Sequence, residues 1–313
     1  MAAPVVNSFK KEATFSAYDK AQGAVYAQAR RDYHPSVYQS IIDHHKSTGG
    51  QFDTLIDIGC GPGNVARGLG KYFDHAFGLD PGEGMISAAR TIGGTTSTDE
   101  PIRFEVSTAE DLGSNLSPPT PEGSVDLIAS GNAAHWFDHA KFWPKAAQML
   151  KPGGSVALWT SGEGRIHPDT PNADTIQAVF DDFREKYLRP YMEYGNLLVL
   201  SQYRDLPLPW TLDEPVLEFD KESFFVKYWE TGEQFYGGVP DMDLATFEKA
   251  IATGSPVTRW RQAHPELVGT DQDVVKIASA KMARLLHEAG VKPGEELIRP
   301  ALNGALLILK KKA

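Results

Sequence analysis

The sequence has a single cysteine, Cys60, and no apolar run near the roughly 20 residues that a membrane-spanning helix needs. One cysteine cannot form an internal disulfide, which favours a reducing compartment. Residues 1–13 mix acidic and basic side chains and lack the apolar core of an export signal. We therefore expect a cytoplasmic protein with no membrane partner.

Runs of basic residues are scarce as well. The formal net charge is −10, and the only lysine run lies at residues 310–312. Binding to nucleic-acid phosphates requires a basic surface, whereas a short terminal lysine run is typical of a solvated tail. We therefore expect a small molecule rather than a nucleic acid as the partner. The sequence leaves the oligomeric state open.

What the sequence does contain is a regular alternation of short β-type and helical segments between residues 54 and 160. Alternating strands and helices imply a parallel sheet with right-handed crossovers. The predicted strands are 54–58, 75–79, 102–106, 125–130 and 155–160, and the predicted helices between them are 65–72, 84–90 and 138–150. Another helix is predicted between Pro35 and Gly49. After residue 160 the rhythm breaks, and we predict helices over 172–188, 243–253 and 271–289 and strands over 219–229 and 302–310.

The most informative segment is a glycine loop that follows the first predicted strand. Gly59, Gly61 and Gly63 permit a tight turn and the close approach of a ligand to the backbone. Cys60 fits there as a small residue rather than a nucleophile. Asp80 ends the next predicted strand, where a carboxylate can accept hydrogen bonds from both hydroxyls of a ribose.

Two cofactors are compatible with a glycine loop and a ribose-binding acid: a dinucleotide and S-adenosylmethionine. Gly61, Gly63 and Ala66 satisfy the loose dinucleotide pattern, but the strand ends at Gly59 rather than at Gly61. Asp57 would also face the pyrophosphate, and like charges at about 4 Å repel by roughly 4 kcal/mol at an effective dielectric near 20. S-adenosylmethionine instead carries a sulfonium and an ammonium, which an acid attracts. We therefore expect S-adenosylmethionine.

Five ordered motifs between residues 57 and 154 carry a resemblance to a known family. The chain resembles the class I S-adenosylmethionine-dependent methyltransferases, and within them it is most similar to the fungal-type trans-aconitate methyltransferase-like proteins. The motifs are the glycine loop, Gly78-Leu79-Asp80-Pro81 followed by Met85, Ala109-Glu110-Asp111-Leu112, Asn132-Ala133-Ala134-His135-Trp136-Phe137-Asp138, and Leu150-Lys151-Pro152-Gly153-Gly154.

The resemblance implies an α/β fold with a doubly wound, mostly parallel, seven-stranded sheet of the Rossmann-like methyltransferase type, whose last strand is antiparallel, and a helical cap. We expect N-terminal cap helices in residues 1–50 and the cofactor-binding core in 51–160. A substrate cap that includes the sixth strand is expected in 161–300, and the last strand in 301–313. The expected cofactor-binding residues are Asp57, Gly59, Cys60, Gly61, Gly63, Asp80, Pro81, Met85, Ala109, Glu110, Ser130 and Asn132.

The acceptor side is less well defined by the sequence. Residues 26–38 resemble a tyrosine-rich family segment, but Arg31-Asp32-Tyr33 departs from the usual Arg-Pro before the tyrosine. Gly254 stands where family members usually carry a tryptophan before the serine. The trans-aconitate substrate itself is therefore not carried over. The candidate substrate-binding residues are Tyr18, Tyr26, Arg30, Tyr33, Trp136, Trp159, Ser255, Arg259 and Trp260, although such aromatics are also typical of a core and such arginines of a surface.

His135 is the candidate catalytic residue, because it follows the fourth predicted strand close to the expected donor site. A hydroxyl or amine acceptor would profit from a base, worth roughly 10² to 10⁴ in rate, whereas a carboxylate acceptor needs only alignment. His135 and His139 lack a third ligand at a regular spacing, so we expect no metal. The leading function is O-methylation of a carboxylic acid. The alternatives are N- or S-methylation of a secondary metabolite and a non-catalytic regulator that binds the cofactor.

Overall fold

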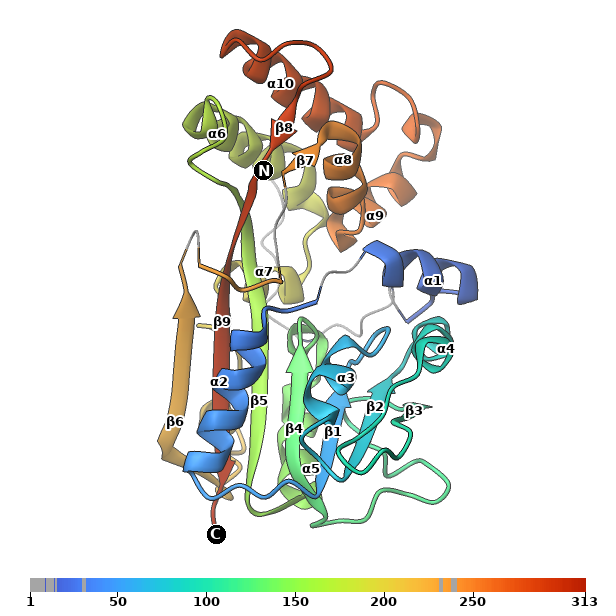
Figure 1. Ribbon diagram of the computed structural model, residues 1–313, viewed down its shortest axis with the longest axis vertical. Helices are drawn as coiled ribbons and strands as arrows, with labels where there is room; N and C mark the ends of the chain where they lie inside the picture. Colours follow the sequence, from blue (N-terminus) through green and yellow to red (C-terminus); the bar gives the residue numbers. More distant parts are fainter. Residues whose placement is uncertain (1–8, 10–13, 15, 30–31, 231–232, 238–240) are drawn as a thin grey trace.

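The computed structural model describes residues 9, 14, 16–29, 32–230, 233–237 and 241–313. Arg30, one of the candidate substrate-binding residues, lies outside these ranges. Seven strands form one sheet in the order β3-β2-β1-β4-β5-β9-β6 (Figure 1). These strands are β1 (Thr54–Ile58), β2 (His75–Asp80), β3 (Arg103–Val106), β4 (Val125–Gly131), β5 (Leu150–Ile166), β6 (Phe219–Trp229) and β9 (Pro300–Lys311).

Strands β1 to β5 run parallel, whereas β9 pairs antiparallel with both β5 and β6. The strand order reverses between β1 and β4, and in open parallel sheets such a reversal opens a crevice at the carboxyl ends of the strands. This arrangement confirms the predicted fold class and the antiparallel last strand. It also fixes where a ligand can bind.

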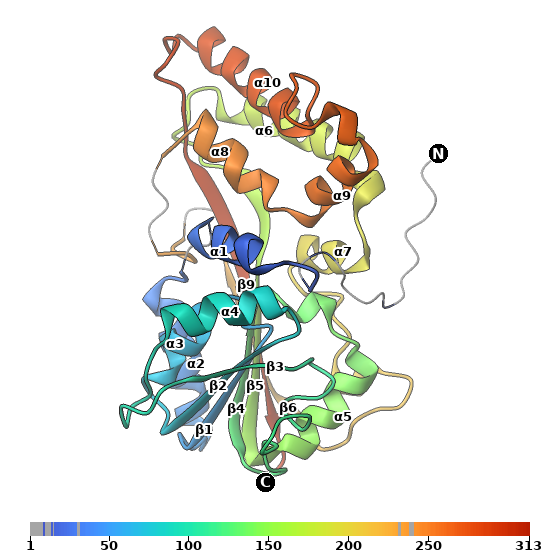
Figure 2. The same ribbon diagram turned by 90° about the vertical axis from the view of Figure 1, so that its right-hand side faces the viewer.

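Helices cover both faces of the sheet because its buried strands alternate their side chains between two cores. Leu55 of β1 packs with helices α2 (Pro35–Ser47), α3 (Asn64–Gly70) and α4 (Glu83–Ile92). The neighbouring Ile56 packs on the opposite face with α5 (His139–Met149). Figure 2 shows these helices on the two sides of the sheet.

Most of the other helices gather beyond the carboxyl end of the sheet, where β5 and β9 extend past their neighbours and stay paired as far as Ile166 and Pro300 (Figure 1). Two apolar clusters of their own hold these helices together. The helices there are α6 (Ala173–Phe183), continued by a π-helical turn over Arg184–Leu188, α8 (Leu244–Ala252), α9 (Ser255–Ala263) and α10 (Val274–Glu288), beside the short strands β7 (Met242–Asp243) and β8 (Leu297–Ile298). None of the helices in the described ranges is long and apolar enough to cross a membrane.

Two further helices lie between the sheet and these cap helices. Helix α1 (Lys20–Ala29) packs against α4, and α7 (Tyr194–Leu200) packs against β5 (Figure 2). Helices α7 and α9 were not among the predicted elements, and α1 lies within residues 1–50, where N-terminal cap helices were expected without bounds of their own. They are short and derive their stability from packing rather than from a strong periodic pattern.

Candidate active site

The loop between β1 and α3 has the backbone geometry that its glycines predict. Gly59, Gly61 and Gly63 have φ angles of 68°, 52° and 88°, a left-handed region in which only glycine is unstrained. A Cβ on Gly59 would lie 2.4 Å from the Cβ of Ala133. The loop therefore touches the segment that follows β4, at the reversal of strand order.

Asp80, at the end of β2, orders this loop and faces the crevice. Its Oδ2 accepts a hydrogen bond from the Gly61 backbone N–H at 2.9 Å. Its Oδ1 accepts another from the Gly82 N–H at 2.8 Å. The carboxylate is thus held in one orientation at the position expected for a ribose-binding acid.

Asp57 lies fully buried beneath the loop rather than in the crevice. Its Oδ2 accepts a hydrogen bond from the Ala66 N–H at 2.9 Å, in the first turn of α3. Its Oδ1 has no hydrogen-bond partner among the described residues. Burial raises the pKa of this carboxyl to about 8. Asp57 therefore acts on a ligand only indirectly, by holding the first turn of α3 and the loop in place.

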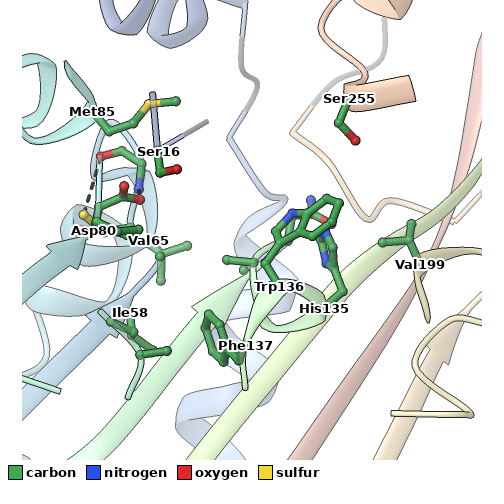
Figure 3. Close-up of a pocket in the computed structure, with 18 of the residues that line it drawn as sticks. Ser16, Ile58, Val65, Asp80, Met85, His135, Trp136, Phe137, Val199 and Ser255 are labelled. Carbon is green, nitrogen blue, oxygen red and sulfur yellow. Dashed lines mark hydrogen bonds between the residues drawn. The ribbon is translucent and has the colours of Figure 1, made fainter. Parts of the chain in front are cut away.

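One continuous cavity of about 770 Å³ opens above the carboxyl ends of β1, β2 and β4. In Figure 3, Asp80, Met85 and Ser16 lie on one side of it and His135 and Trp136 near its middle. Ser255 of α9 and Val199 of α7 lie on the far side (Figure 3). The cavity thus joins the glycine loop to the cap helices.

Most of the predicted cofactor-binding residues line this cavity: Gly59, Cys60, Gly61, Asp80, Pro81, Met85, Ala109, Glu110 and Asn132. Gly63 instead begins helix α3, and Ser130 is fully buried within β4. The Glu110 Oε1 accepts a hydrogen bond from the Asp138 N–H at 2.9 Å. That contact fixes the acidic segment after β3 against the segment after β4.

The predicted substrate-binding residues separate into two groups. Tyr26, Tyr33, Trp136 and Ser255 line the cavity. Trp159, Trp260, Tyr18 and Arg259 are not among its lining residues. Trp159 is fully buried in the sheet, Trp260 is buried in the cap core, and Tyr18 packs edge-on against Tyr26 at 6.1 Å. For the two tryptophans the structure thus favours the core interpretation over substrate contact.

Arg259 is engaged within the cap. Its guanidinium contacts the Glu193 carboxylate at 3.2 Å and donates to Asn196 Oδ1 at 2.6 Å. It also donates to the Tyr191 carbonyl at 2.7 Å and to Ser255 Oγ at 3.3 Å. Because Asn196 and Ser255 line the cavity, Arg259 supports the wall rather than forming it.

His135 lines the middle of the cavity, in the 3-10 turn Ala134–Trp136 that follows β4. Its Nδ1 lies 2.9 Å from the Tyr203 hydroxyl. Tyr203 is fully buried, and burial raises the pKa of its phenol, which stays protonated. Tyr203 therefore orients the imidazole. Among the described residues, no cluster of three His, Cys, Asp or Glu side chains is arranged to hold a metal.

Several lining residues were not predicted from the sequence, namely Tyr236, Ser161, Asn196, Val199 and Ser16. Tyr236 is the most informative of these, because Asn132 donates hydrogen bonds to both the Tyr33 and the Tyr236 hydroxyls, at 3.0 and 2.7 Å. These tyrosines come from segments about 200 residues apart, and no local pattern in the sequence indicates that they meet.

The comparisons with known proteins agree with this geometry. A family model described as a methyltransferase domain matches residues 56–158. Methyltransferase cfoB of Aspergillus candidus is 28% identical over 283 residues, which cover 80% of this chain and 83% of that protein. A Saccharomyces cerevisiae protein assigned as an S-adenosylmethionine-dependent methyltransferase is 32% identical over 174 residues, which cover 56% of this chain and 52% of that protein. The alignment thus spans about half the length of the yeast relative.

A solved structure from Anaeromyxobacter dehalogenans, assigned as a type II methyltransferase, superposes with a TM-score of 0.58 at 24% identity, covering 89% of this chain and 97% of that one. The fold is therefore that of the Rossmann-like methyltransferases. Residues 56–158 form a methyltransferase domain, and the chain is an S-adenosylmethionine-dependent methyltransferase with S-adenosylmethionine as its cofactor. The finer resemblance to trans-aconitate methyltransferase-like proteins stays a prediction.

Proposed function

We propose that this chain transfers a methyl group to an oxygen atom of a small organic molecule. One observation carries the proposal. The loop end and the cap end belong to a single cavity of about 770 Å³, with His135 and Trp136 between them (Figure 3). Donor and acceptor can therefore lie in line within one enclosure, and such alignment can supply about 7–11 kcal/mol of the barrier.

The residues at the loop end fit the donor. The fixed Asp80 carboxylate suits the ribose hydroxyls, while Met85 and Val65 offer apolar contacts for a flat base. The Asp80 carboxylate provides a negative charge that favours a cation over a pyrophosphate. When bound, S-adenosylmethionine supplies a methyl group on an already activated sulfonium. The chain's own task is then to bind, to align and to exclude water.

For the acceptor, a carboxylic acid is the first candidate, because the family resemblance implies it. A hydroxyl is the second candidate, favoured by His135, whose imidazole lines the cavity and is oriented by Tyr203. Arg259 gives a carboxylate no direct support, since Glu193 and Asn196 engage its guanidinium. A cytoplasmic setting and a role for residues 161–300 in acceptor choice belong to the same proposal.

The test is a turnover assay with isotopically labelled S-adenosylmethionine and acceptor pairs that share one carbon skeleton, such as benzoic acid and benzyl alcohol. Mass spectrometry then reports whether a labelled methyl ester, a methyl ether or neither is formed. We expect labelled O-methyl products. Donor binding without transfer to any acceptor would favour the non-catalytic alternative, and products methylated only on nitrogen or sulfur would contradict the choice of oxygen.

A further inference from the structure

Asn132, directly after β4, is held in a single orientation by a backbone donor. Its Oδ1 accepts hydrogen bonds from the Ser161 backbone N–H at 2.8 Å and from the Thr160 hydroxyl at 3.0 Å. A backbone N–H can only donate, so the amide oxygen must face β5. The amide nitrogen must then face the cavity side, where Tyr33 and Tyr236 lie.

The amide nitrogen donates to both tyrosine hydroxyls, at 3.0 Å for Tyr33 and 2.7 Å for Tyr236. An amide NH₂ only donates, so each hydroxyl oxygen is an acceptor in these bonds and its own proton points elsewhere. The two rings stack at 5.2 Å with an interplanar angle of 17°, and the backbones of the two residues form an antiparallel bridge. Asn132 thus fixes the positions of both hydroxyl oxygens.

The pair lies over the end of β4, where the cavity begins. A Cβ on Gly131 would lie 2.9 Å from the Tyr33 hydroxyl oxygen and 2.9 Å from the Trp159 ring. Glycine at this position is therefore required for the tyrosine to approach the strand so closely. Gly131, Asn132 and both tyrosines line the cavity, and the two phenol rings are otherwise buried.

Two O–H donors are chemically suited to an acceptor's oxygen atom, but not to the oxygen that attacks the methyl group. Donation to the attacking oxygen would occupy the lone pair that forms the new bond and would lower its nucleophilicity. Donation to a neighbouring oxygen instead positions the acceptor and leaves the nucleophile free. Buried hydroxyls of this kind also discriminate strongly against a ligand that lacks the matching group.

We propose that Tyr33 and Tyr236, oriented by Asn132, bind a carbonyl or carboxylate oxygen of the acceptor that is not the methylated one. The substrate class is therefore a molecule in which a second, hydrogen-bond-accepting oxygen accompanies the nucleophilic oxygen. This assignment rests on the proposed function. It makes Tyr236, on the segment between β6 and β7, a specificity-determining residue.

The experiment uses three probes with one carbon skeleton: cinnamate, cinnamamide and cinnamyl alcohol. Each is titrated into the complex of the full chain with S-adenosylhomocysteine, for the wild type, Tyr236→Phe and Tyr33→Phe. We expect cinnamate and cinnamamide to bind more tightly than the alcohol. Each phenylalanine variant should bind these two about 10-fold or more weakly, the range of a hydrogen bond to a buried polar group, with the alcohol unchanged.

Tyr38→Phe is the matched control. The Tyr38 hydroxyl donates to Asp32 at 2.6 Å and belongs to the same aromatic cluster, but Tyr38 is not among the cavity's lining residues. Its variant should bind all three probes as the wild type does. Thermal unfolding of each complex checks that the variants fold.

Equal probe affinities in the wild type and both cavity variants would overturn the inference, as would a wild type that binds none of the probes or shows no preference for the carbonyl-bearing ones. Failure of S-adenosylhomocysteine to bind at all would instead overturn the proposed function. The two failures are therefore distinguishable in one set of titrations.

Discussion

At the scale of single residues, His135 separates the two candidate acceptors. A carboxylate is already ionised near pH 7, so His135 can only position it, and His135→Asn should keep at least about a tenth of the activity. A hydroxyl must lose a proton as the bond forms, so the same variant should lose about 10²-fold on a hydroxyl acceptor. The measurement is a pH–rate profile for both proteins on each acceptor.

In the hydroxyl case, the wild type should also lose activity at low pH, where a protonated imidazole cannot accept the proton, and that limb should vanish in the variant. Tyr203→Phe is the companion variant, because it removes the hydroxyl that lies 2.9 Å from the His135 Nδ1 and keeps the ring. A hundredfold loss in His135→Asn on a carboxylate acceptor, with a histidine-like limb, would contradict the positioning role.

The raised pKa of Asp57 predicts how the free energy of unfolding depends on pH. Its folded-state pKa, raised to about 8 by burial, lies far above its ordinary value of 3.8. The folded state therefore holds this proton over a pH range in which the unfolded state has lost it. The resulting stabilisation is present at low pH and is lost as the pH rises toward and through 8. Between pH 7 and 8 the free energy of unfolding should fall by up to about 1.4 kcal/mol.

The check is chemical denaturation of the donor-free protein between pH 7 and 9, for the wild type and Asp57→Asn. The asparagine should flatten this dependence, because it is neutral throughout. Burial lowers the pKa values of His45 and His139 to about 4, so these histidines affect stability in a separate, lower pH range. Their contribution is lost as the pH falls from about 6.5 to 4. A pH dependence between 7 and 9 that is identical in both proteins would contradict the assignment to Asp57.

Individual residues also show what the sequence could predict of the site. Gly59, Gly61 and Asp80 were identifiable because a tight turn after a strand requires glycines and an acid follows at the end of the next strand. The structure contains this turn, with positive φ angles at both glycines and a hydrogen bond from the Gly61 N–H to Asp80. Tyr236 was not identifiable, because its role exists only through its contact with Asn132, some hundred positions earlier. Trp159 and Trp260 illustrate the reverse case. A tryptophan can either line a pocket or pack in a core, and only the packing in the structure shows that these two belong to the core.

At the scale of elements, the packing of α1 on α4 predicts donor affinity. A Cβ on Gly23 would lie 2.4 Å from the Gly84 carbonyl oxygen, too close for any side chain. Gly23→Ala must therefore push α1, which carries Tyr26, away from α4, which carries Met85, and both side chains line the cavity. Overpacking of this kind costs about 1–3 kcal/mol, so donor affinity should fall about 10-fold, at roughly 1.4 kcal/mol per tenfold.

The control for this prediction is Ala24→Ser, at an exposed neighbouring position on α1. Its donor affinity should equal that of the wild type. Fluorescence or calorimetric titration with S-adenosylhomocysteine measures both variants. If Gly23→Ala binds the donor normally, α1 does not help to close the loop end of the cavity.

A second prediction at this scale concerns the contact between α7 and α9. Arg259 links α9 to the start of α7 through Glu193 and Asn196. Arg259→Gln should therefore displace the cap end of the cavity and raise the acceptor KM about 10-fold, given about 1.5–3 kcal/mol for hydrogen bonds to a charged group. The donor Kd should change by less than about twofold, because donor and acceptor ends are separate.

Arg261→Gln is its matched control, because Arg261 also lies on α9 and pairs with the buried Asp273 at 3.0 Å. Asp273 is not among the cavity's lining residues, whereas Asn196, the partner of Arg259, is. It should lower stability without altering the acceptor KM. Steady-state kinetics on the acceptor found by the turnover assay, together with thermal unfolding, compare the two. Equal effects of the two variants on the acceptor KM would show that Arg259 contributes stability alone.

The elements themselves were predictable where their pattern was strong. Strands β1 to β4 and helices α5 and α10 begin and end within a few residues of the predicted ranges. Helix α9, with its polar residues Thr258, Arg259 and Arg261, shows little periodicity, and its amphipathic face becomes evident only against Trp260 and the cap core. Strand β5 extends past Thr160, and β9 begins before Leu302, because the two strands pair with each other beyond the rest of the sheet.

At the scale of the whole molecule, the topology explains why one cavity serves two ligands. The reversal of strand order between β1 and β4 creates the crevice. The paired extensions of β5 and β9 carry the cap helices over that crevice, where α7 and α9 supply the far wall (Figures 1 and 2). The division into a donor core and an acceptor cap is our proposal from this arrangement.

The central claim is that the loop end of the cavity binds S-adenosylmethionine through Asp80. The most direct test is calorimetric titration of the full chain with S-adenosylmethionine, S-adenosylhomocysteine and NAD. The proteins compared are the wild type, Asp80→Asn and the control Asp53→Asn. Asp53 directly precedes β1, and its exposed carboxylate pairs with Lys151. We predict that the wild type and Asp53→Asn bind both sulfur compounds and not NAD. Asp80→Asn should bind them about 1.5–3 kcal/mol more weakly. Tight binding of NAD without binding of S-adenosylmethionine, or equal donor affinity in all three proteins, would contradict the account.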